Sequence, residues 1–254
     1  MKNQTQFSPL LLVVICLLFL LAAFSAFAGG KHSNGIEAKQ GNTAKPNFDI
    51  VHAKVTASGN IATFHMAISG KAGASTPVAT GKVAGSEAFA YVWPTTLNAY
   101  DVGFEKDAGI LALAVASHPD FDDTPLFDEN GDTNYDNDGN VWHSHWVVLT
   151  PDDRCGEGKL AVKDIPQGQT PRLPRTWPGL PILIDSPGYD PVLTGESVDI
   201  RVPFPDAAVI DSAGYDAVTS GLRVNANLHA PFFCVVDVFD VASGDLSLPG
   251  KVNQ

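Results

Sequence analysis

The stretch DIVHAKVTASGNIATFHMAIS, residues 49–69, decides the fold class. Two segments, 49–57 and 60–69, alternate between apolar and polar residues on either side of Ser58-Gly59-Asn60. A period of two is typical of a strand with one buried face, and a short turn containing glycine joins neighbouring strands. The stretch therefore predicts a β-hairpin.

Similar segments recur along the rest of the chain, and no convincing amphipathic helix separates them. Further strands are expected at residues 87–93, 109–116, 141–149, 159–165, 197–204, 222–229 and 232–241. Many short strands broken by glycine and proline favour an all-β fold, an antiparallel β-sandwich or barrel-like structure with long loops. We expect a single domain over residues 47–254.

A proline-rich loop, residues 166–191, interrupts this pattern. Proline fixes φ and removes a donor from the strand ladder, so the loop should cross the surface as an extended connection. The alternative is a linker between two small sheets.

The amino terminus has the pattern of a secretory signal peptide over residues 1–28. Lys2 precedes an apolar run, and Ala26-Phe27-Ala28 supplies a cleavage site of small residues. The alternative is an uncleaved membrane anchor. Residues 29–46 are polar and glycine-rich, which predicts a flexible leader. We expect an exported protein, periplasmic or extracellular, without a membrane segment after cleavage.

The chain is acidic, with a formal net charge of −12. Cleavage of the signal peptide would remove one basic residue, Lys2, and no acidic one, which changes the charge from −12 to −13. Such a protein repels nucleic acid and anionic lipid, so neither is expected as a partner.

Two cysteines remain after cleavage, because Cys16 lies in the signal peptide. In an oxidising compartment Cys155 and Cys234 are expected to form a disulfide. The alternative role, thiolate metal ligands, is disfavoured because neither belongs to a C-x-x-C pair.

An acidic loop, residues 120–140, carries side-chain oxygens at alternating positions. These residues are Asp128, Asn130, Asp132, Asn134, Asp136, Asp138 and Asn140. Hard cations collect six to eight oxygen ligands, so the loop predicts a calcium site. The structural alternative is a polar turn whose Asp and Asn side chains cap their own backbone.

Locally, over about a dozen residues, this loop resembles the calcium loops of EF-hand and thrombospondin type 3 proteins. With Asp128 as the first position, the alternating ligands match, but the twelfth position is Gly139, where an EF-hand has a glutamate. Starting at Asn134 instead places His145 there. The resemblance therefore implies the preferred ion and not the EF-hand fold.

His143 and His145 lie two residues apart in the expected strand 141–149. Residues at this spacing project from one face, so both imidazoles can reach one zinc or copper ion. A third ligand is needed, and His118 is the first candidate, with His65 and His229 as alternatives. Otherwise the two histidines are ordinary polar residues on a half-exposed sheet face.

The string His143-Ser144-His145-Trp146 also resembles the zinc-binding HxHW strand of α-type carbonic anhydrases. The resemblance covers these four residues, and no second histidine strand follows at a matching spacing. It implies a zinc hydro-lyase as one alternative function.

Taken with the absence of a G-x-S-x-G motif, these patterns favour a binding protein over an enzyme. We expect an exported metal-binding protein, with calcium in the acidic loop and zinc or copper at the His-x-His strand. The alternatives are a zinc- or copper-dependent hydrolase, hydro-lyase or oxidase, and a structural or adhesive module stabilised by calcium. Metal ions are the only partners that the sequence indicates.

Overall fold

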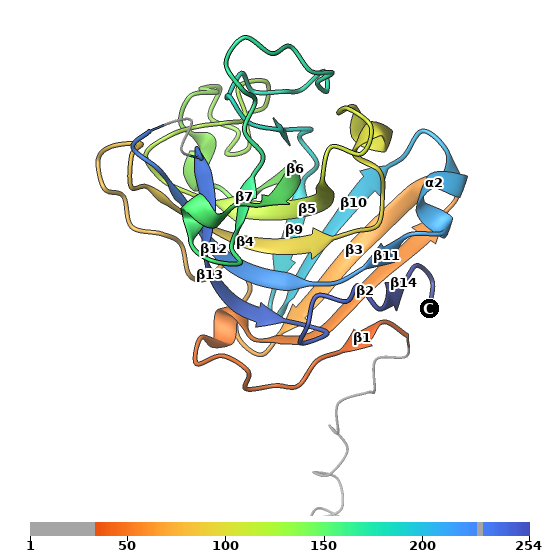
Figure 1. Cartoon of the computed structure of the whole chain (residues 1–254). Coiled ribbons are helices and arrows are strands. Elements are labelled where there is room, and N and C mark those ends of the chain that lie inside the picture. The colour runs from red at the N-terminus through yellow and green to blue at the C-terminus, as the bar shows by residue number, and fades with distance from the viewer. Residues whose placement is uncertain (1–33, 228–230) are drawn as a thin grey trace, which may run out of the picture. The chain divides into compact units, whose positions relative to one another are not determined.

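The computed structural model describes residues 34–227 and 231–254. The predicted signal peptide and part of the predicted leader lie outside these residues, and so does His229. Within the described part the chain is almost entirely β, and its strands are antiparallel (Figure 1). The predicted fold class is therefore confirmed.

One layer is an open five-stranded sheet with the order β1-β2-β3-β10-β9. Its strands are β1 (Ile36–Glu37), β2 (Ile50–Ser58), β3 (Ile61–Ile68), β9 (Pro191–Thr194) and β10 (Ser197–Pro203). The predicted hairpin is β2–β3, closed where Ser58 pairs with Ile61. Gly59 in this turn has a φ of +58°, a value that glycine adopts at little steric cost.

The second layer is a barrel-like sheet closed by six strands in the order β5-β4-β12-β13-β7-β6, with β6 pairing back to β5. Its strands are β4 (Glu87–Pro94), β5 (Ile110–Ser117), β6 (His143–Pro151), β7 (Leu160–Val162), β12 (Val218–Val224) and β13 (Phe233–Val241). The two-residue strand β8 (Ile184–Asp185) extends the sheet from β6.

The remaining elements are short. They are η1 (Pro46–Phe48), η2 (Ala99–Val102), η3 (Asp138–Asn140), η4 (Asp153–Cys155), α2 (Ala207–Asp211), β11 (Gly214–Tyr215) and β14 (Gly250–Lys251). Across residues 34–227 and 231–254, no helix has the length and apolarity needed to cross a bilayer.

Two apolar cores result, because strands β4, β5 and β6 are buried on both faces. Trp93, Leu113 and Trp146 belong to the core between the barrel and the open sheet, while Ala90 and Ala114 belong to the core inside the barrel. Side chains alternate between faces along a strand, so both sets of positions must be apolar. This explains why β4 and β5 have nearly continuous apolar sequences.

Several segments differ from the expectations. Ile36–Glu37, within the predicted flexible leader, pairs with β2, and the buried Ile36 side chain provides the apolar contact that holds it there. The proline-rich loop contains β8 instead of being extended throughout. β12 begins at Val218 and ends at Val224, earlier than predicted, because its pairing with β13 is interrupted by two bulges that obscure the alternation.

The predicted disulfide is confirmed. Cys155 in η4 and Cys234 on β13 are bonded, with their Cα atoms 5.5 Å apart. The bond ties the segment after β6 to the barrel wall.

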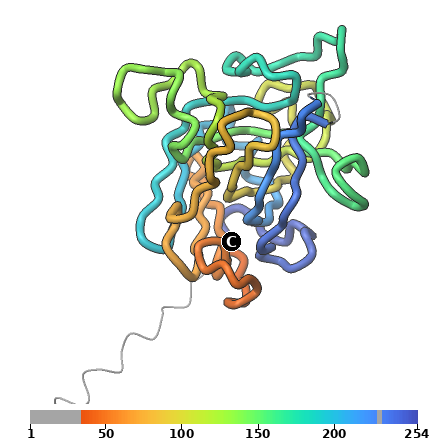
Figure 2. The backbone as a smooth tube through the Cα atoms, turned by 90° about the vertical axis from the view of Figure 1, so that its left-hand side faces the viewer, coloured from red at the N-terminus to blue at the C-terminus, as the bar shows by residue number. Residues whose placement is uncertain are grey.

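The acidic loop connects β5 to β6 and projects beyond the ends of the strands, in light green in Figure 2. Where the loop begins, Ser117 and His118 form hydrogen bonds with its last residues, Gly139 and Asn140. The Ser117 hydroxyl donates to the carbonyl of Asn140, and the amide of His118 donates to the carbonyl of Gly139.

Candidate metal centre

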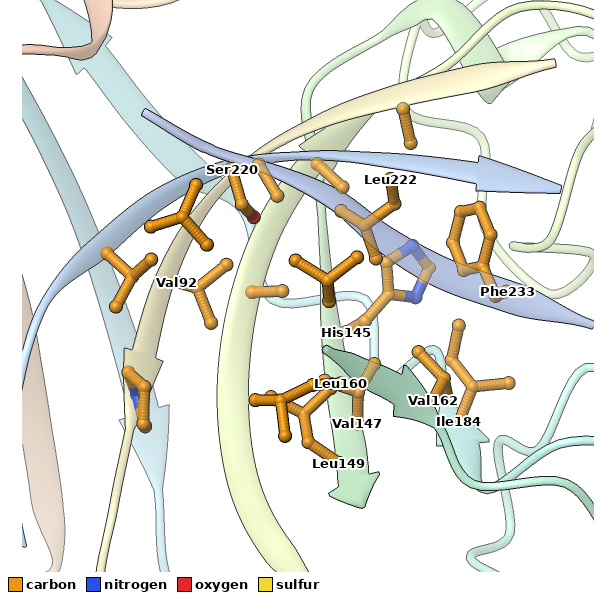
Figure 3. Close-up of a pocket in the computed structure, with 18 of the residues that line it drawn as sticks. Val92, His145, Val147, Leu149, Leu160, Val162, Ile184, Ser220, Leu222 and Phe233 are labelled. Atoms are coloured by element: carbon orange, nitrogen blue, oxygen red, sulfur yellow. The ribbon is translucent and has the colours of Figure 1, made fainter. Parts of the chain in front are cut away.

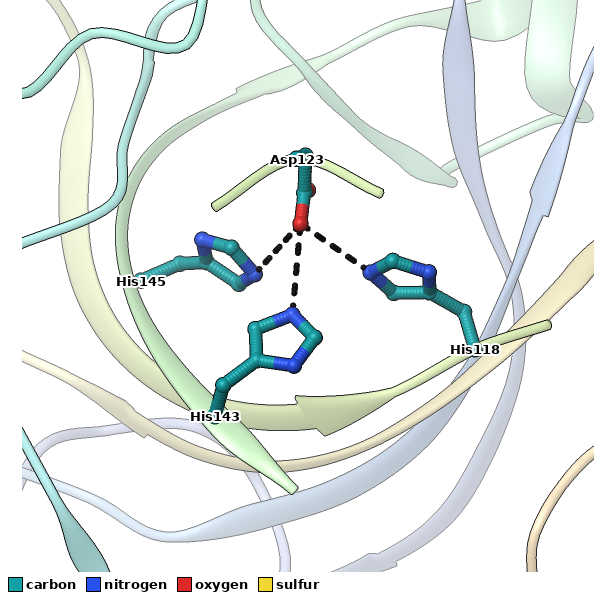
Figure 4. A group of neighbouring side chains, drawn as sticks. All are labelled: His118, Asp123, His143 and His145. Carbon is teal, nitrogen blue, oxygen red and sulfur yellow. Dashed lines mark hydrogen bonds and ion pairs between the residues drawn. The ribbon is translucent and has the colours of Figure 1, made fainter. Parts of the chain in front are cut away.

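Four buried side chains converge at the end of the barrel: His118, Asp123, His143 and His145 (Figure 4). Oδ1 of Asp123 lies 3.2 Å from Nε2 of His118, 3.2 Å from Nε2 of His143 and 3.3 Å from Nε2 of His145. Three imidazole nitrogens therefore face one carboxylate oxygen. All four side chains are less than 5% exposed.

Strand β6 supplies two of the histidines in the predicted way. His143 and His145 project from the same face, into the barrel, while Trp146 projects into the core against the open sheet. His118 follows the last residue of the neighbouring strand β5, whose Ala116 pairs with His143. The third histidine of the group is therefore His118, which was the first candidate from the sequence.

Asp123 is positioned by the turn that follows His118. The carboxylate of Asp120 accepts hydrogen bonds from the backbone amides of Thr80 and Gly81. The carboxylate of Asp122 accepts a hydrogen bond from the backbone amide of Asp138. These contacts turn Asp120 and Asp122 away from the histidines and leave Asp123 facing them. Asp123 was not among the ligands predicted from the sequence.

Backbone contacts fix the tautomer of His143. Its Nδ1 lies 2.6 Å from the carbonyl oxygen of Val141. A carbonyl only accepts, so Nδ1 carries the proton and donates it. In the neutral ring Nε2 then presents its lone pair to Asp123.

The tautomer of His145 follows from Ser186. The Ser186 hydroxyl donates to the backbone carbonyl of Asp123 at 2.5 Å, so its proton is already used. Its oxygen lies 3.2 Å from Nδ1 of His145 and must accept from it. Nε2 of His145 therefore also presents a lone pair to the centre.

These two nitrogens have no hydrogen-bond partner. Within residues 34–227 and 231–254, Nε2 of His143 and Nε2 of His145 are buried atoms whose contacts with Asp123 lack hydrogen-bonding geometry. Lone pairs that face a carboxylate oxygen in a buried site repel it, and such unpartnered buried groups are costly. A cation between them would remove this cost.

Electrostatics also favour an ionised Asp123. Burial opposes ionisation, but the charges of His145 and His118, the hydrogen bond with His118 and the close contact with His143 hold the pKa of the Asp123 carboxyl well below its usual value. For His143, burial lowers the pKa, while the close contact with the Asp123 carboxylate and its charge raise it, and the net shift is upward. The pKa of His145 is lowered, chiefly by burial. In metal-free protein, a proton on His143 can therefore take the place of a cation.

The spacing of the four atoms suits a small transition ion. Zinc in a tetrahedral site lies about 2.0–2.1 Å from nitrogen and oxygen ligands, which places neighbouring ligand atoms about 3.3 Å apart. The three separations from Asp123 Oδ1 agree with this value. Imidazole prefers zinc, copper, nickel or iron over calcium or magnesium.

A polar cleft of about 360 Å³ reaches His143 from outside the barrel. Asp128, Glu129 and Asp190 line it with carboxylates. Burial raises the pKa of Glu129, although the charge of His143 acts to lower it. The cleft thus offers acidic side chains along a path to the histidines.

The acidic loop uses many of its oxygens for its own backbone. The Asp128 carboxylate accepts hydrogen bonds from the backbone amides of Asp132 and Thr133. The Asp132 carboxylate accepts one from the backbone amide of Asn134. Asp138 is fully buried, and its carboxylate accepts hydrogen bonds from the backbone amides of Glu129 and Asn130. This is the capping arrangement that Asp and Asn commonly form in turns.

Gly139 shows why the EF-hand register does not apply. A Cβ atom there would lie 2.1 Å from the carbonyl oxygen of Phe121, so a glutamate cannot be accommodated. Among the residues that the structure describes, the only group of three or more His, Cys, Asp or Glu side chains close enough for one ion is the histidine centre. Calcium binding by the loop remains a prediction.

The other candidates for a third ligand lie elsewhere. His65 on β3 contacts Asp199 of β10, with Nδ1 2.8 Å from the carboxylate, in the open sheet. His229 lies outside the described residues, so its place in the centre is untested.

Comparison with family models, curated proteins and solved structures gave no match to this chain.

Proposed function

We propose that this chain is an exported metal-binding protein that holds one zinc or copper ion between His118, Asp123, His143 and His145. The observation that carries the proposal is the pair of unpartnered Nε2 lone pairs, from His143 and His145, which face Asp123 Oδ1 in a buried site.

The tautomers of these histidines add a second argument. Histidines that bind a metal commonly donate their other ring N–H to a carbonyl or another polar group, which fixes the ring. His143 donates to Val141 in this way, and His145 donates to Ser186. Both rings are thus oriented before an ion arrives.

The number of donors favours binding over hydrolysis. Structural zinc sites have four protein ligands, whereas catalytic sites keep one position for water or substrate. Three histidines and one aspartate would fill a tetrahedral shell. A hydrolase, hydro-lyase or oxidase would need an additional or displaced ligand.

Two features support export. The amino-terminal sequence is typical of a signal peptide, and the Cys155–Cys234 disulfide suits an oxidising compartment.

Metal analysis of protein purified without an affinity tag or chelator tests the proposal. We expect one zinc or copper ion per chain, and loss of that ion in His143→Ala/His145→Ala and in Asp123→Asn. His65→Ala is the matched control, because it removes an imidazole that contacts an aspartate outside the centre.

Stoichiometric metal in the folded double variant would refute the proposal. So would failure of the folded wild-type protein to take up zinc or copper. Near-UV circular dichroism establishes that each variant is folded.

A further inference from the structure

The interior of the barrel contains a cavity of about 80 Å³. Apart from Ser220 and three residues of the metal centre, every side chain that lines it is apolar. Figure 3 shows the His145 ring among the side chains of Leu222, Phe233 and Val162.

Small side chains on one side of the barrel account for this space. β4 and β5 direct alanines into the interior, while β6 and β7 direct valines and leucines into it. The inward alanines are Ala88, Ala90, Ala112, Ala114 and Ala116. A barrel of this size has room for little more than side chains, so a wall of alanines leaves part of it unfilled.

The cavity meets the metal centre at one end. His118, Asp123 and His145 belong to its lining, and Ala114 of β5 pairs directly with His145. A molecule in the cavity would therefore lie beside the ligands of the ion.

The other end of the cavity is lined by residues that reach the surface. Val238 and Leu246 are 46% and 38% exposed, and both line the cavity. The cavity thus extends from an apolar opening to the buried histidines, on a different path from the acidic cleft at His143.

We propose that this cavity binds a small, uncharged, apolar molecule, of the size of dioxygen, next to the metal ion. The inference rests on the proposed function for the identity of the neighbouring centre. An apolar cavity stays dry and takes apolar guests, and one of about 150 Å³ accommodates benzene or xenon. At about half that volume, the present cavity suits xenon or a diatomic molecule. Ions and strongly hydrated molecules are excluded because they would lose their water without compensation.

Xenon is the probe. We expect ¹²⁹Xe NMR to show saturable binding to wild-type protein, with or without zinc. Ala114→Leu should abolish this binding by filling the space beside His145, and Ala90→Val should weaken it. Val115→Ile is the matched control, because Val115 lies next to Ala114 on β5 and faces the other core.

Cobalt(II) tests whether the guest lies near the ion. In protein loaded with paramagnetic cobalt, the bound xenon resonance should be shifted or broadened relative to zinc-loaded protein. An unchanged resonance would overturn the proposal, because the guest would then be distant from the metal.

The two proposals can fail separately. Xenon binding with no uptake of zinc, copper or cobalt would reject the metal centre, and with it a guest next to a metal. Metal uptake without xenon binding would reject the cavity proposal and leave the metal centre intact. If Ala114→Leu does not fold, undiminished xenon binding by folded Ala90→Val would still contradict the proposed location.

Discussion

Ser186 Oγ lies 3.2 Å from Nδ1 of His145 and determines which nitrogen of that ring faces the metal centre. The hydroxyl also donates to the carbonyl of Asp123, so one side chain orients two residues of the candidate metal centre that are 22 positions apart in the sequence.

Ser186→Ala should therefore weaken metal binding without removing a ligand. Loss of an outer-shell partner costs roughly 10–100-fold in affinity. Competition with a chromophoric chelator measures the change. Ser197→Ala is the control, because its hydroxyl contacts Thr194 in the open sheet. Equal affinity of Ser186→Ala and the wild type would show that the contact does not orient His145.

Asp123→Asn should have a larger effect, since it removes the negative charge from the centre. We expect a loss of affinity beyond the roughly 10–100-fold cost of an outer-shell change. Asp122→Asn provides the comparison, because it removes the same charge from a neighbouring residue that does not face the histidines, and its single amide oxygen can still accept from Thr124. If both variants bind zinc equally well, Asp123 is not a ligand.

Metal retention should fall as the pH decreases. The ion requires neutral imidazoles, whose ordinary pKa is about 6.5. Burial lowers the pKa of His143 but Asp123 raises it overall, so in metal-free protein His143 binds a proton at a higher pH than a free imidazole does. Protons should therefore compete with the metal from above pH 6.5 downward. Zinc content after dialysis between pH 8 and 5, with circular dichroism on the same samples, measures this. Constant zinc content across the range would exclude histidine ligands.

Glu129→Gln should slow metal uptake and leave the final metal content unchanged. Glu129 lines the acidic cleft that reaches His143 but is not one of the four converging side chains. A cation is attracted along a path of negative charge, and the effect decreases with added salt. Stopped-flow uptake with a fluorescent zinc indicator measures the rate. Asp136→Asn makes the same charge change outside the cleft, and an equal slowing in both variants would argue against the cleft as the route.

Removal of the disulfide should destabilise the fold but spare the centre. Cys155 and Cys234 enclose a separation of 79 residues. In the chain-entropy model such a bond contributes roughly 4 kcal/mol to the free energy of unfolding. Cys155→Ser/Cys234→Ser should lose stability of this order in urea titrations and still bind one metal ion. Loss of metal from the folded variant would contradict this, because neither cysteine belongs to the centre.

The fold class could be predicted because strand period is a local property. The hairpin β2–β3 appears directly in the alternation of residues 49–69. Closure of the barrel could not be predicted, because the pairing of β7 with β13 joins residues about 70 positions apart, such as Ala161 and Cys234.

The candidate site was predicted only in part, for a similar reason. His143 and His145 follow from strand geometry, and His118 from its place before the acidic loop. Asp123 is one of several acidic residues in its segment, and only contacts with distant residues such as Thr80 and Gly81 select it. Ser186 lies in the proline-rich loop, where no periodicity marks an inward-facing side chain.

The four converging side chains all belong to β6 and to the chain that connects it with β5. This hairpin, with the segments that contain Thr80, Gly81 and Ser186, can thus assemble the centre without waiting for β12 or β13, and closing a short loop costs less entropy than closing a long one. An ion bound at that stage would cross-link a folding intermediate. Metal supply would then control how fast the newly made chain matures, and starvation for the ion would leave it exposed to proteases while the barrel is still open.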